Sequence, residues 1–178
     1  MISDTNFVGK HILMDSKVKT IFKISNSLNV KQYIEGLTNL INMTLVVPPI
    51  VVEFPFANEA IALAKNLRNE LPDLKSEILN QFFNRMERKN KKEAGVSGIA
   101  IWAESHTSFH SWPDDFFASF DIYSCNNFDH MKSINYAIQS FDIVNASILI
   151  VERYIDIPHK IFTMEVKDGN IITNSTPS

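Results

Sequence analysis

The sequence predicts an α+β fold, a two-layer sandwich in which helices cover one face of a mostly antiparallel sheet. Two observations favour it. Segments that alternate apolar and polar residues, as strands do, are mixed with segments whose apolar residues recur every three or four positions, as in helices. The predicted order is β-α-β-α(α)-β-β-β-α-β-β, which lacks the strict alternation expected of a parallel βαβ fold.

The first strand is predicted at residues 7–14, and a helix capped by Ser27 or Asn29 follows it. Residues 44–54 predict a strand that Pro48 and Pro49 confine to an edge or a bulge, because proline donates no ladder hydrogen bond. Two helices are expected within 57–93. The other expected elements are strands at 97–104 and 116–125, a helix from Asn127 or Asp129 to Phe141, strands at 144–153 and 159–166, and a frayed tail at 168–178.

Composition indicates one soluble globular domain of 178 residues, with 45% hydrophobic and 21% charged residues. A net charge of −3 gives no electrostatic reason to expect nucleic acid as a partner. The single cysteine excludes an internal disulfide and suits a reducing compartment. We see no signal-peptide pattern, and the longest apolar run, 45–52, is too short to span a membrane. We therefore expect a cytoplasmic protein.

Residues 95–114 concentrate groups that carry out nucleophilic and proton-transfer chemistry. They are Glu104, Ser105, His106, Ser108, His110, Ser111 and Trp112. A Ser/His nucleophilic pair is one interpretation, although the G-x-S-x-G elbow is missing. A zinc site at His106 and His110 is another, but it requires both on one helical turn and a third ligand, so no metal is expected. The third is that these polar groups only satisfy one another at a sheet edge.

Four short motifs lie here at fixed spacing: Gly95-Val-Ser-Gly98, Glu104-Ser-His106, His110-Ser-Trp-Pro-Asp114 and Asp121-Ile-Tyr-Ser-Cys125. Together they resemble the S-adenosylmethionine decarboxylase proenzyme family in its short prokaryotic, pyruvoyl-dependent form. The stretch Gly9-Lys-His-Ile-Leu13 is similar to that family's first strand. The resemblance covers 95–125 and extends over 7–54 and 127–153. It is absent over 57–93, which we expect to be a helical insertion.

The resemblance implies a single-domain proenzyme that cuts itself between Glu104 and Ser105, giving chains 1–104 and 105–178. The Ser105 hydroxyl would attack the Glu104 carbonyl in an N→O acyl shift. Elimination and hydrolysis would then leave a covalent pyruvoyl group at position 105. In that family the pyruvoyl carbonyl forms a Schiff base with the substrate and accepts the electrons left when carbon dioxide departs. The product is the aminopropyl donor for spermidine synthesis.

Further site residues are implied by the same motifs. Ser97 and His110 match the residues that assist processing, one by hydrogen bonding the intermediate and the other by handling the proton lost in elimination. Cys125 matches the acid that reprotonates the substrate carbon. Trp112 and Asp114 match part of the substrate site, with Asp114 replacing the family's glutamate.

Substrate choice and assembly stay open. The aromatic residue that normally precedes the Gly-Val-Ser-Gly motif is absent, and Phe54 or Phe56 could supply the ring instead. These departures leave arginine or ornithine decarboxylation on the same fold as an alternative. An inactive regulatory relative is another, although the chain retains the implied catalytic residues. A homodimer is expected, with the apolar stretch 44–56 as surface to bury.

Strand parity predicts the local geometry. Ser97 and Ser105 are eight residues apart and would share one face of an unbroken strand, whereas Ser105 and His110, five apart, would face oppositely. For all three to meet in one site, a turn or bulge must fall near Ser105. A strained backbone at the scissile bond would also favour the acyl shift.

Overall fold

The computed structural model describes residues 6–54 and 94–174, with side chains as far as Ile172. In chain order the helices and strands of these residues are β1 (Phe7–Val18), α1 (Ser27–Leu40), β2 (Ile50–Phe54), β3 (Gly95–Trp102), β4 (Ser105–Trp112), the 3₁₀ turn η3 (Pro113–Asp115), β5 (Phe117–Ser124), α4 (His130–Phe141), β6 (Ile143–Tyr154), β7 (Lys160–Lys167) and β8 (Asn170–Asn174). The helices expected within 57–93, and Phe56, lie outside the described residues.

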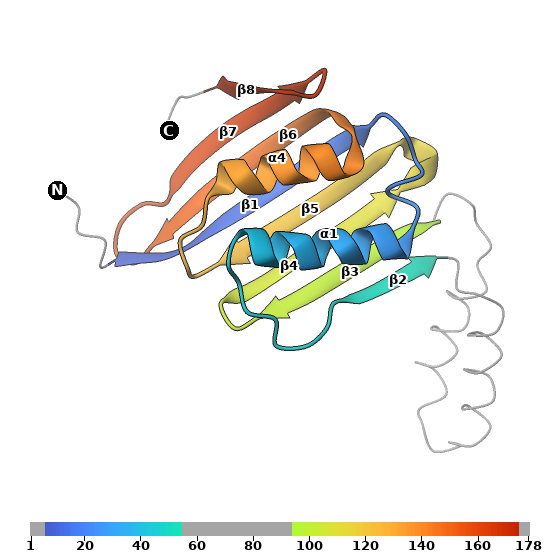
Figure 1. Cartoon of the computed structure of the whole chain (residues 1–178). Helices are drawn as coiled ribbons and strands as arrows, with labels where there is room; N and C mark the ends of the chain where they lie inside the picture. Colours follow the sequence, from blue (N-terminus) through green and yellow to red (C-terminus); the bar gives the residue numbers. More distant parts are fainter. Residues whose placement is uncertain (1–5, 55–93, 175–178) are drawn as a thin grey trace, which may run out of the picture.

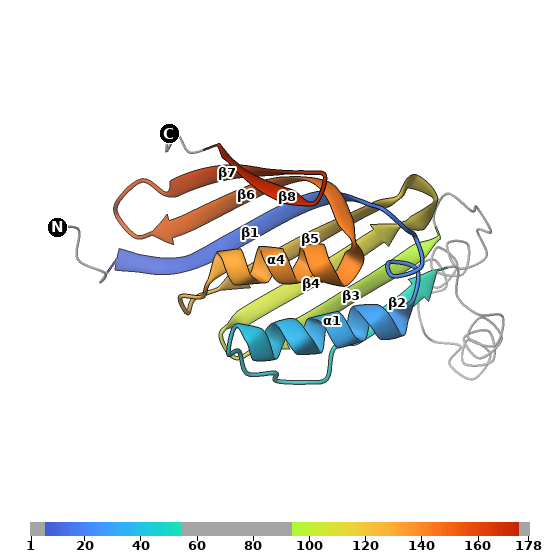
Figure 2. The same cartoon turned by 45° about the horizontal axis from the view of Figure 1, so that its top comes forward.

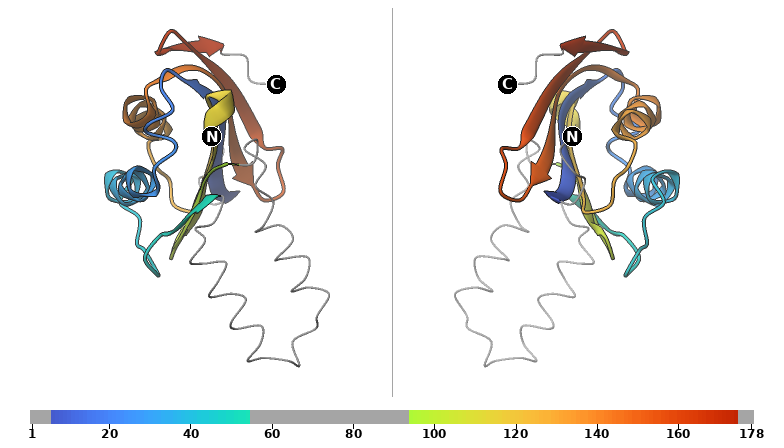
Figure 3. Two further views of the ribbon diagram at one scale, coloured as in Figure 1. Left: turned by 90° about the vertical axis from the view of Figure 1, so that its right-hand side faces the viewer. Right: turned by 90° about the vertical axis from the view of Figure 1, so that its left-hand side faces the viewer.

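One sheet of eight strands joins all the described strands, in the order β2-β3-β4-β5-β1-β6-β7-β8. Every neighbouring pair is antiparallel. Helices α1 and α4 lie side by side across one face (Figures 1 and 2). Seen edge-on, both helices lie on the same side of the sheet (Figure 3). The predicted α+β two-layer sandwich is confirmed.

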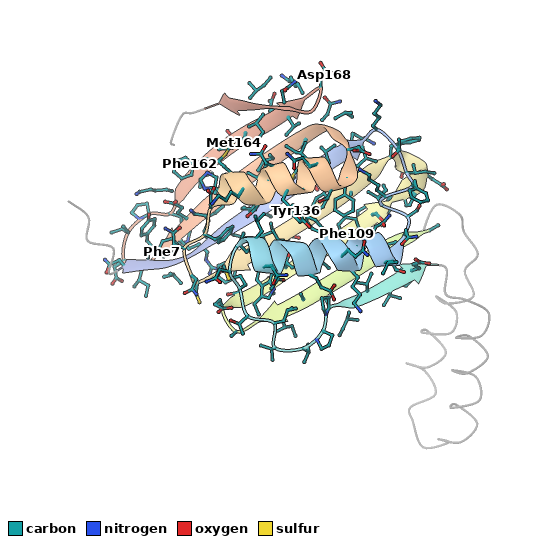
Figure 4. All side chains as sticks on the ribbon, viewed as in Figure 1. Phe7, Phe109, Tyr136, Phe162, Met164 and Asp168 are labelled. Carbon is teal, nitrogen blue, oxygen red and sulfur yellow. The ribbon has the colours of Figure 1, made fainter. Side chains whose placement is uncertain are left out.

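The core lies between the two helices and the sheet. On β4, Phe109 (labelled in Figure 4) is fully buried. Its ring lies 5.1 Å from those of Phe120 on β5 and Phe141 on α4. Helix α1 contributes the apolar stripe predicted from its spacing: Val30, Tyr33, Ile34 and Leu37. Side chains alternate across a strand, so every second side chain of each strand lies on the face of the sheet that the helices do not cover. We call this face the open face.

Two helix caps differ in detail from the prediction. Asn26 caps α1, because its side chain accepts hydrogen bonds from the backbone N–H groups of Leu28 and Asn29. Neither Ser27 nor Asn29, the residues expected there, is the cap. For α4, Asp129 is the cap, as one of the two expected candidates, and it accepts from the N–H of Lys132.

The strand expected at 44–54 is shorter than predicted. Only Ile50–Phe54 pairs, with β3, because Pro48 and Pro49 lack the N–H groups that a ladder needs. Leu45, before the prolines, forms an isolated bridge with Trp102. This bridge brings residues 44–46 to the β3–β4 turn.

The expectation of a frayed tail from 168 onward is wrong for residues 170–174. They form β8, a hairpin partner of β7. Asp168 and Gly169 both have positive φ, 50° and 77°, as the favoured two-residue hairpin turn requires. The Asp-Gly dipeptide is the sequence signal for that turn.

Candidate active site

Strands β3 and β4 form a hairpin whose two-residue turn is Ala103–Glu104, so that Trp102 pairs with Ser105. A turn therefore falls at Ser105, as the parity argument required. The same register places Ser97 directly opposite His110. The Ser97 hydroxyl and the His110 Nδ1 lie 2.9 Å apart, within hydrogen-bond distance, on the open face.

Two glycines of the Gly-Val-Ser-Gly motif allow this pairing. A Cβ at Gly95 would overlap the carbonyl oxygen of Ser111 on β4, so only glycine lets the strands approach here. A Cβ at Gly98 would lie 3.0 Å from Ile34 and 3.1 Å from Val30, so α1 packs directly on that point. Ser97 therefore lies between Gly95, where β3 closely approaches the backbone of β4, and Gly98, where β3 contacts α1.

The peptide bond between Glu104 and Ser105 lies at the start of β4, and its surroundings are unusual. Ser105 has φ 149°, a conformation that non-glycine residues rarely adopt, so the backbone strain expected beside the Glu104–Ser105 bond is present. The backbone N–H of Cys125 donates a 3.1 Å hydrogen bond to the Glu104 carbonyl oxygen. The Cys125 thiol is free and exposed. We call Glu104, Ser105 and Cys125 the cleavage cluster.

The structure does not bring all the predicted residues together within one chain. Ser105 and His110 are five positions apart on one continuous strand, a separation of roughly 17 Å at 3.4 Å per residue. The turn precedes Ser105, so it brings Ser97 to His110 but leaves Ser105 far from both. The turn near Ser105 therefore does not bring Ser97, Ser105 and His110 together within one chain, and the predicted residues form two clusters.

The residues expected to bind substrate lie near the Ser97–His110 pair. Trp112 is on the open face, 37% exposed, with its ring 5.4 Å from Phe117 and 6.3 Å from His110. Asp114 is exposed in η3, directly after β4. Phe54 ends the edge strand β2, opposite Gly95. Phe56 lies outside the described residues.

The alternative chemistries find less support. His106 and His110 are four positions apart on an extended strand, too far apart to bind one zinc ion. Residues 6–54 and 94–174 contain no group of three or more potential metal ligands. Ser97 and His110 do form a Ser/His pair, but the described residues give the imidazole no carboxylate partner to orient it.

No helix in the described ranges is long and apolar enough to span a bilayer.

Sequence reasoning missed a hollow at the start of β1. It has a volume of about 390 Å³ and is lined by Phe7, Asn127, Glu152 and Tyr154. Phe7 lies at the start of β1 (Figure 4), and its ring contacts that of Tyr154 edge-on at 5.9 Å. Asn127 is two residues after Cys125. No spacing pattern links these four positions, because β1, β6 and the β5–α4 loop meet only in the folded chain.

Lys10 supports the loop that carries Cys125. This lysine is buried, and its Nζ donates to the Asn127 side chain at 3.1 Å and to the Phe128 carbonyl at 3.3 Å. Glu152 balances its charge, with an N–O distance of 3.6 Å. A buried cation retains its charge only with such partners. The loop after β5 is thus tied to β1 and β6 from inside the protein.

Comparisons with known proteins agree with the motif resemblance. A family model described as S-adenosylmethionine decarboxylase matches residues 56–154, more than half of the chain. An S-adenosylmethionine decarboxylase proenzyme of Pyrococcus horikoshii is 39% identical over 70 residues, 39% of this chain and 50% of that protein. An arginine decarboxylase proenzyme of Hyperthermus butylicus is 49% identical over 45 residues, 25% of this chain and 32% of that protein. The chain therefore spans about half the length of the Pyrococcus relative.

The fold has a solved counterpart. The crystal structure of the adenosylmethionine decarboxylase from Aquifex aeolicus aligns with a TM-score of 0.57 at 20% identity, covering 84% of this chain and 93% of that one. At that identity the likeness concerns the fold alone. The family match begins at residue 56 and takes in 57–93, the segment predicted to be an insertion, so that prediction stays untested.

Proposed function

Because the chain belongs to the S-adenosylmethionine decarboxylase family, we propose that it is a self-cleaving proenzyme that becomes a pyruvoyl-dependent decarboxylase of S-adenosylmethionine. One observation carries the proposal. The Glu104–Ser105 bond lies between a strained serine and a carbonyl that already accepts an N–H from Cys125. A serine hydroxyl beside a polarised carbonyl is what an N→O acyl shift requires.

The proposed cleavage uses the Ser105 hydroxyl as the nucleophile. Its oxygen adds to the Glu104 carbonyl carbon, and the C–N bond breaks. The nitrogen takes up the proton that the hydroxyl loses and becomes a free amine, so that an ester links the two chains. Removal of the Cα proton of residue 105 then breaks the Cβ–O bond and releases chain 1–104 with a free carboxylate. The remaining enamine takes up a proton at Cβ and becomes an imine. Water then hydrolyses the imine, which releases ammonia and leaves a pyruvoyl group at position 105. No external oxidant or reductant is needed.

Two features of the cleavage cluster favour the first step. Negative charge develops on the Glu104 carbonyl oxygen as the hydroxyl adds, and the Cys125 N–H, 3.1 Å away, is placed to stabilise it. The φ of 149° at Ser105 costs about 1–3 kcal/mol in the uncleaved chain, and cleavage releases that strain. Ground-state strain and charge stabilisation thus act on the same bond.

The pyruvoyl group would supply an electron sink for the charge left when carbon dioxide departs. The chain's own residues would do the rest. The hollow at Phe7 and Tyr154 would receive the aromatic part of the substrate, and Glu152 would face its positive charge. Cys125, exposed beside position 105, would return a proton to the substrate carbon.

Replacing the thiol tests this role. We expect Cys125→Ala to leave self-cleavage largely intact, because the backbone N–H that contacts Glu104 remains, and to lower carbon dioxide release about tenfold or more. Misdirected protonation should also convert the pyruvoyl group to alanine, which mass spectrometry of chain 105–178 detects. A lower melting temperature with unchanged turnover would instead make Cys125 a packing residue.

Assembly as a homodimer would complete the site. Ser97 and His110 face outward on the open face, and Ser105 of the same chain is out of their reach. In a twofold dimer built on the open faces, each chain's Ser97–His110 pair would meet its partner's cleavage cluster. The large apolar side chains exposed on that face support burial there: Leu13, Ile50, Ile99, Ile101 and Trp112.

Substrate identity is settled by an assay. Carbon dioxide release is measured side by side from S-adenosylmethionine, arginine and ornithine with the processed protein, and we expect turnover of the first. The arginine decarboxylase relative and the shorter Asp114 favour arginine as the second candidate. Turnover of arginine alone would replace the proposed substrate while leaving the pyruvoyl chemistry in place.

A further inference from the structure

The turn that carries the scissile bond is tied to a segment 60 residues earlier in the chain. The N–H of Ala103 donates to the Thr44 carbonyl at 2.9 Å, and the N–H of Val46 donates to the Ile101 carbonyl at 3.0 Å. These bonds continue the β3 ladder past the end of the hairpin. Residues 44–46 therefore fix the approach of the chain to Glu104.

Thr44 also binds the Glu104 side chain. Its N–H donates to one carboxylate oxygen at 2.9 Å, and its hydroxyl donates to the other at 3.1 Å. The hydrogen bond from the Thr44 backbone lowers the pKa of the Glu104 carboxyl, so the carboxylate is ionised at neutral pH. All three polar groups of Thr44 thus contact the two-residue turn.

The segment that carries Thr44 is itself anchored in the core. Met43, its neighbour, is buried, and the N–H of Met43 donates to the Thr38 carbonyl of α1 at 2.9 Å. The Met43 sulfur lies 3.4 Å from the hydroxyl of Ser124, the residue before Cys125. Thr44 is therefore held at a fixed position relative to both sides of the cleavage cluster.

Glu104 is held from two directions. Thr44 binds its side chain and the preceding N–H, while Cys125 binds its carbonyl oxygen. Ser105 follows immediately with its φ of 149°. A free two-residue turn would relax such a backbone by rotating the peptide, and the two sets of contacts oppose that rotation.

We propose that Thr44 is a positioning residue for self-cleavage, which keeps the Glu104–Ser105 peptide in its strained, attack-ready conformation. The inference rests on the proposed function, because it takes this bond to be the one that is cut. Thr44 touches no reacting atom. It acts through the Glu104 side chain and the Ala103 amide, and its effect belongs to the rate of cleavage rather than to turnover after cleavage.

The rate of self-cleavage is the direct readout. Full-length chain is synthesised in a cell-free system, and its conversion to two chains is followed on denaturing gels. Thr44→Val removes the hydroxyl and keeps the backbone contacts, so cleavage should slow about threefold to tenfold, the factor one hydrogen bond supplies. Glu104→Ala removes both side-chain contacts and should slow cleavage further. Thr44→Ser, which keeps the hydroxyl, should restore the rate.

The matched control is Thr163→Val, which changes an exposed threonine on β7 in the same way. It should cleave at the wild-type rate. In a background with Ser105→Ala, which prevents cleavage, Thr44→Val should leave the melting temperature unchanged but speed hydrogen exchange of the Ala103 amide. That combination separates positioning from a general loss of stability.

Each remaining outcome decides against the inference. If the wild-type chain cleaves, and the Thr44→Val and Glu104→Ala variants both cleave as fast as the wild type, Thr44 has no positioning role and the proposed function stands. If Thr44→Val slows cleavage only by lowering the melting temperature, and Thr44→Ser does not restore the rate, Thr44 is merely structural. If wild-type chain never cleaves, the inference falls together with the proposed function.

Discussion

A Ser105→Ala variant should remain one chain of 178 residues and release no carbon dioxide from any of the three candidate substrates. Alanine has no hydroxyl to add to the Glu104 carbonyl, so neither the ester nor the pyruvoyl group forms. The loss is complete rather than graded, because position 105 supplies both the nucleophile of cleavage and the electron sink of decarboxylation. Denaturing gels and intact mass distinguish the two states directly.

The wild-type protein, unlike the Ser105→Ala variant, should cleave itself. It should separate into chains 1–104 and 105–178, and the second chain should resist Edman degradation because its first group is a ketoacid. Ser108→Ala, three residues along the same strand, is the control and should cleave normally. His110→Ala should slow or stall the elimination. The mechanism is wrong if wild-type protein decarboxylates as a single chain. A single chain without activity would favour a regulatory protein.

Most of the fold follows from local patterns in the sequence. Period-two alternation identifies β3 and β5, and apolar spacing identifies α1 and α4, because each has one face on the core. The errors occur where local and tertiary effects compete. Pro48 and Pro49 shorten β2. The Asp168–Gly169 turn allows the polar residues 170–174 to pair with β7, and they form β8.

The candidate site was only partly predictable for the same reason. Motif spacing identifies Ser97, Ser105, His110 and Cys125, but it does not say which of them meet. A two-residue turn at 103–104 decides that His110 pairs with Ser97 and not with Ser105. The contacts of Thr44 with Glu104 join residues 60 positions apart, and no periodicity encodes them.

The separation of the two clusters makes a testable statement about the dimer. If each active site combines the cleavage cluster of one chain with the Ser97–His110 pair of the other, substitutions should complement across chains. Dimers are assembled from one Cys125→Ala chain and one His110→Ala chain, and two different affinity tags isolate the mixed species. One of its two sites then contains no substitution at all.

Such mixed dimers should show about half of the wild-type decarboxylase activity, although each variant alone is nearly inactive, because one of two equivalent sites is complete. The His110→Ala chain should also recover self-cleavage, since its partner supplies the imidazole. The matched control places both substitutions on one chain and pairs it with a wild-type chain. A shared site predicts almost no activity for this control, whereas a site within one chain predicts half. Activity in the control, with none in the complementing pair, would show that each chain builds its own site.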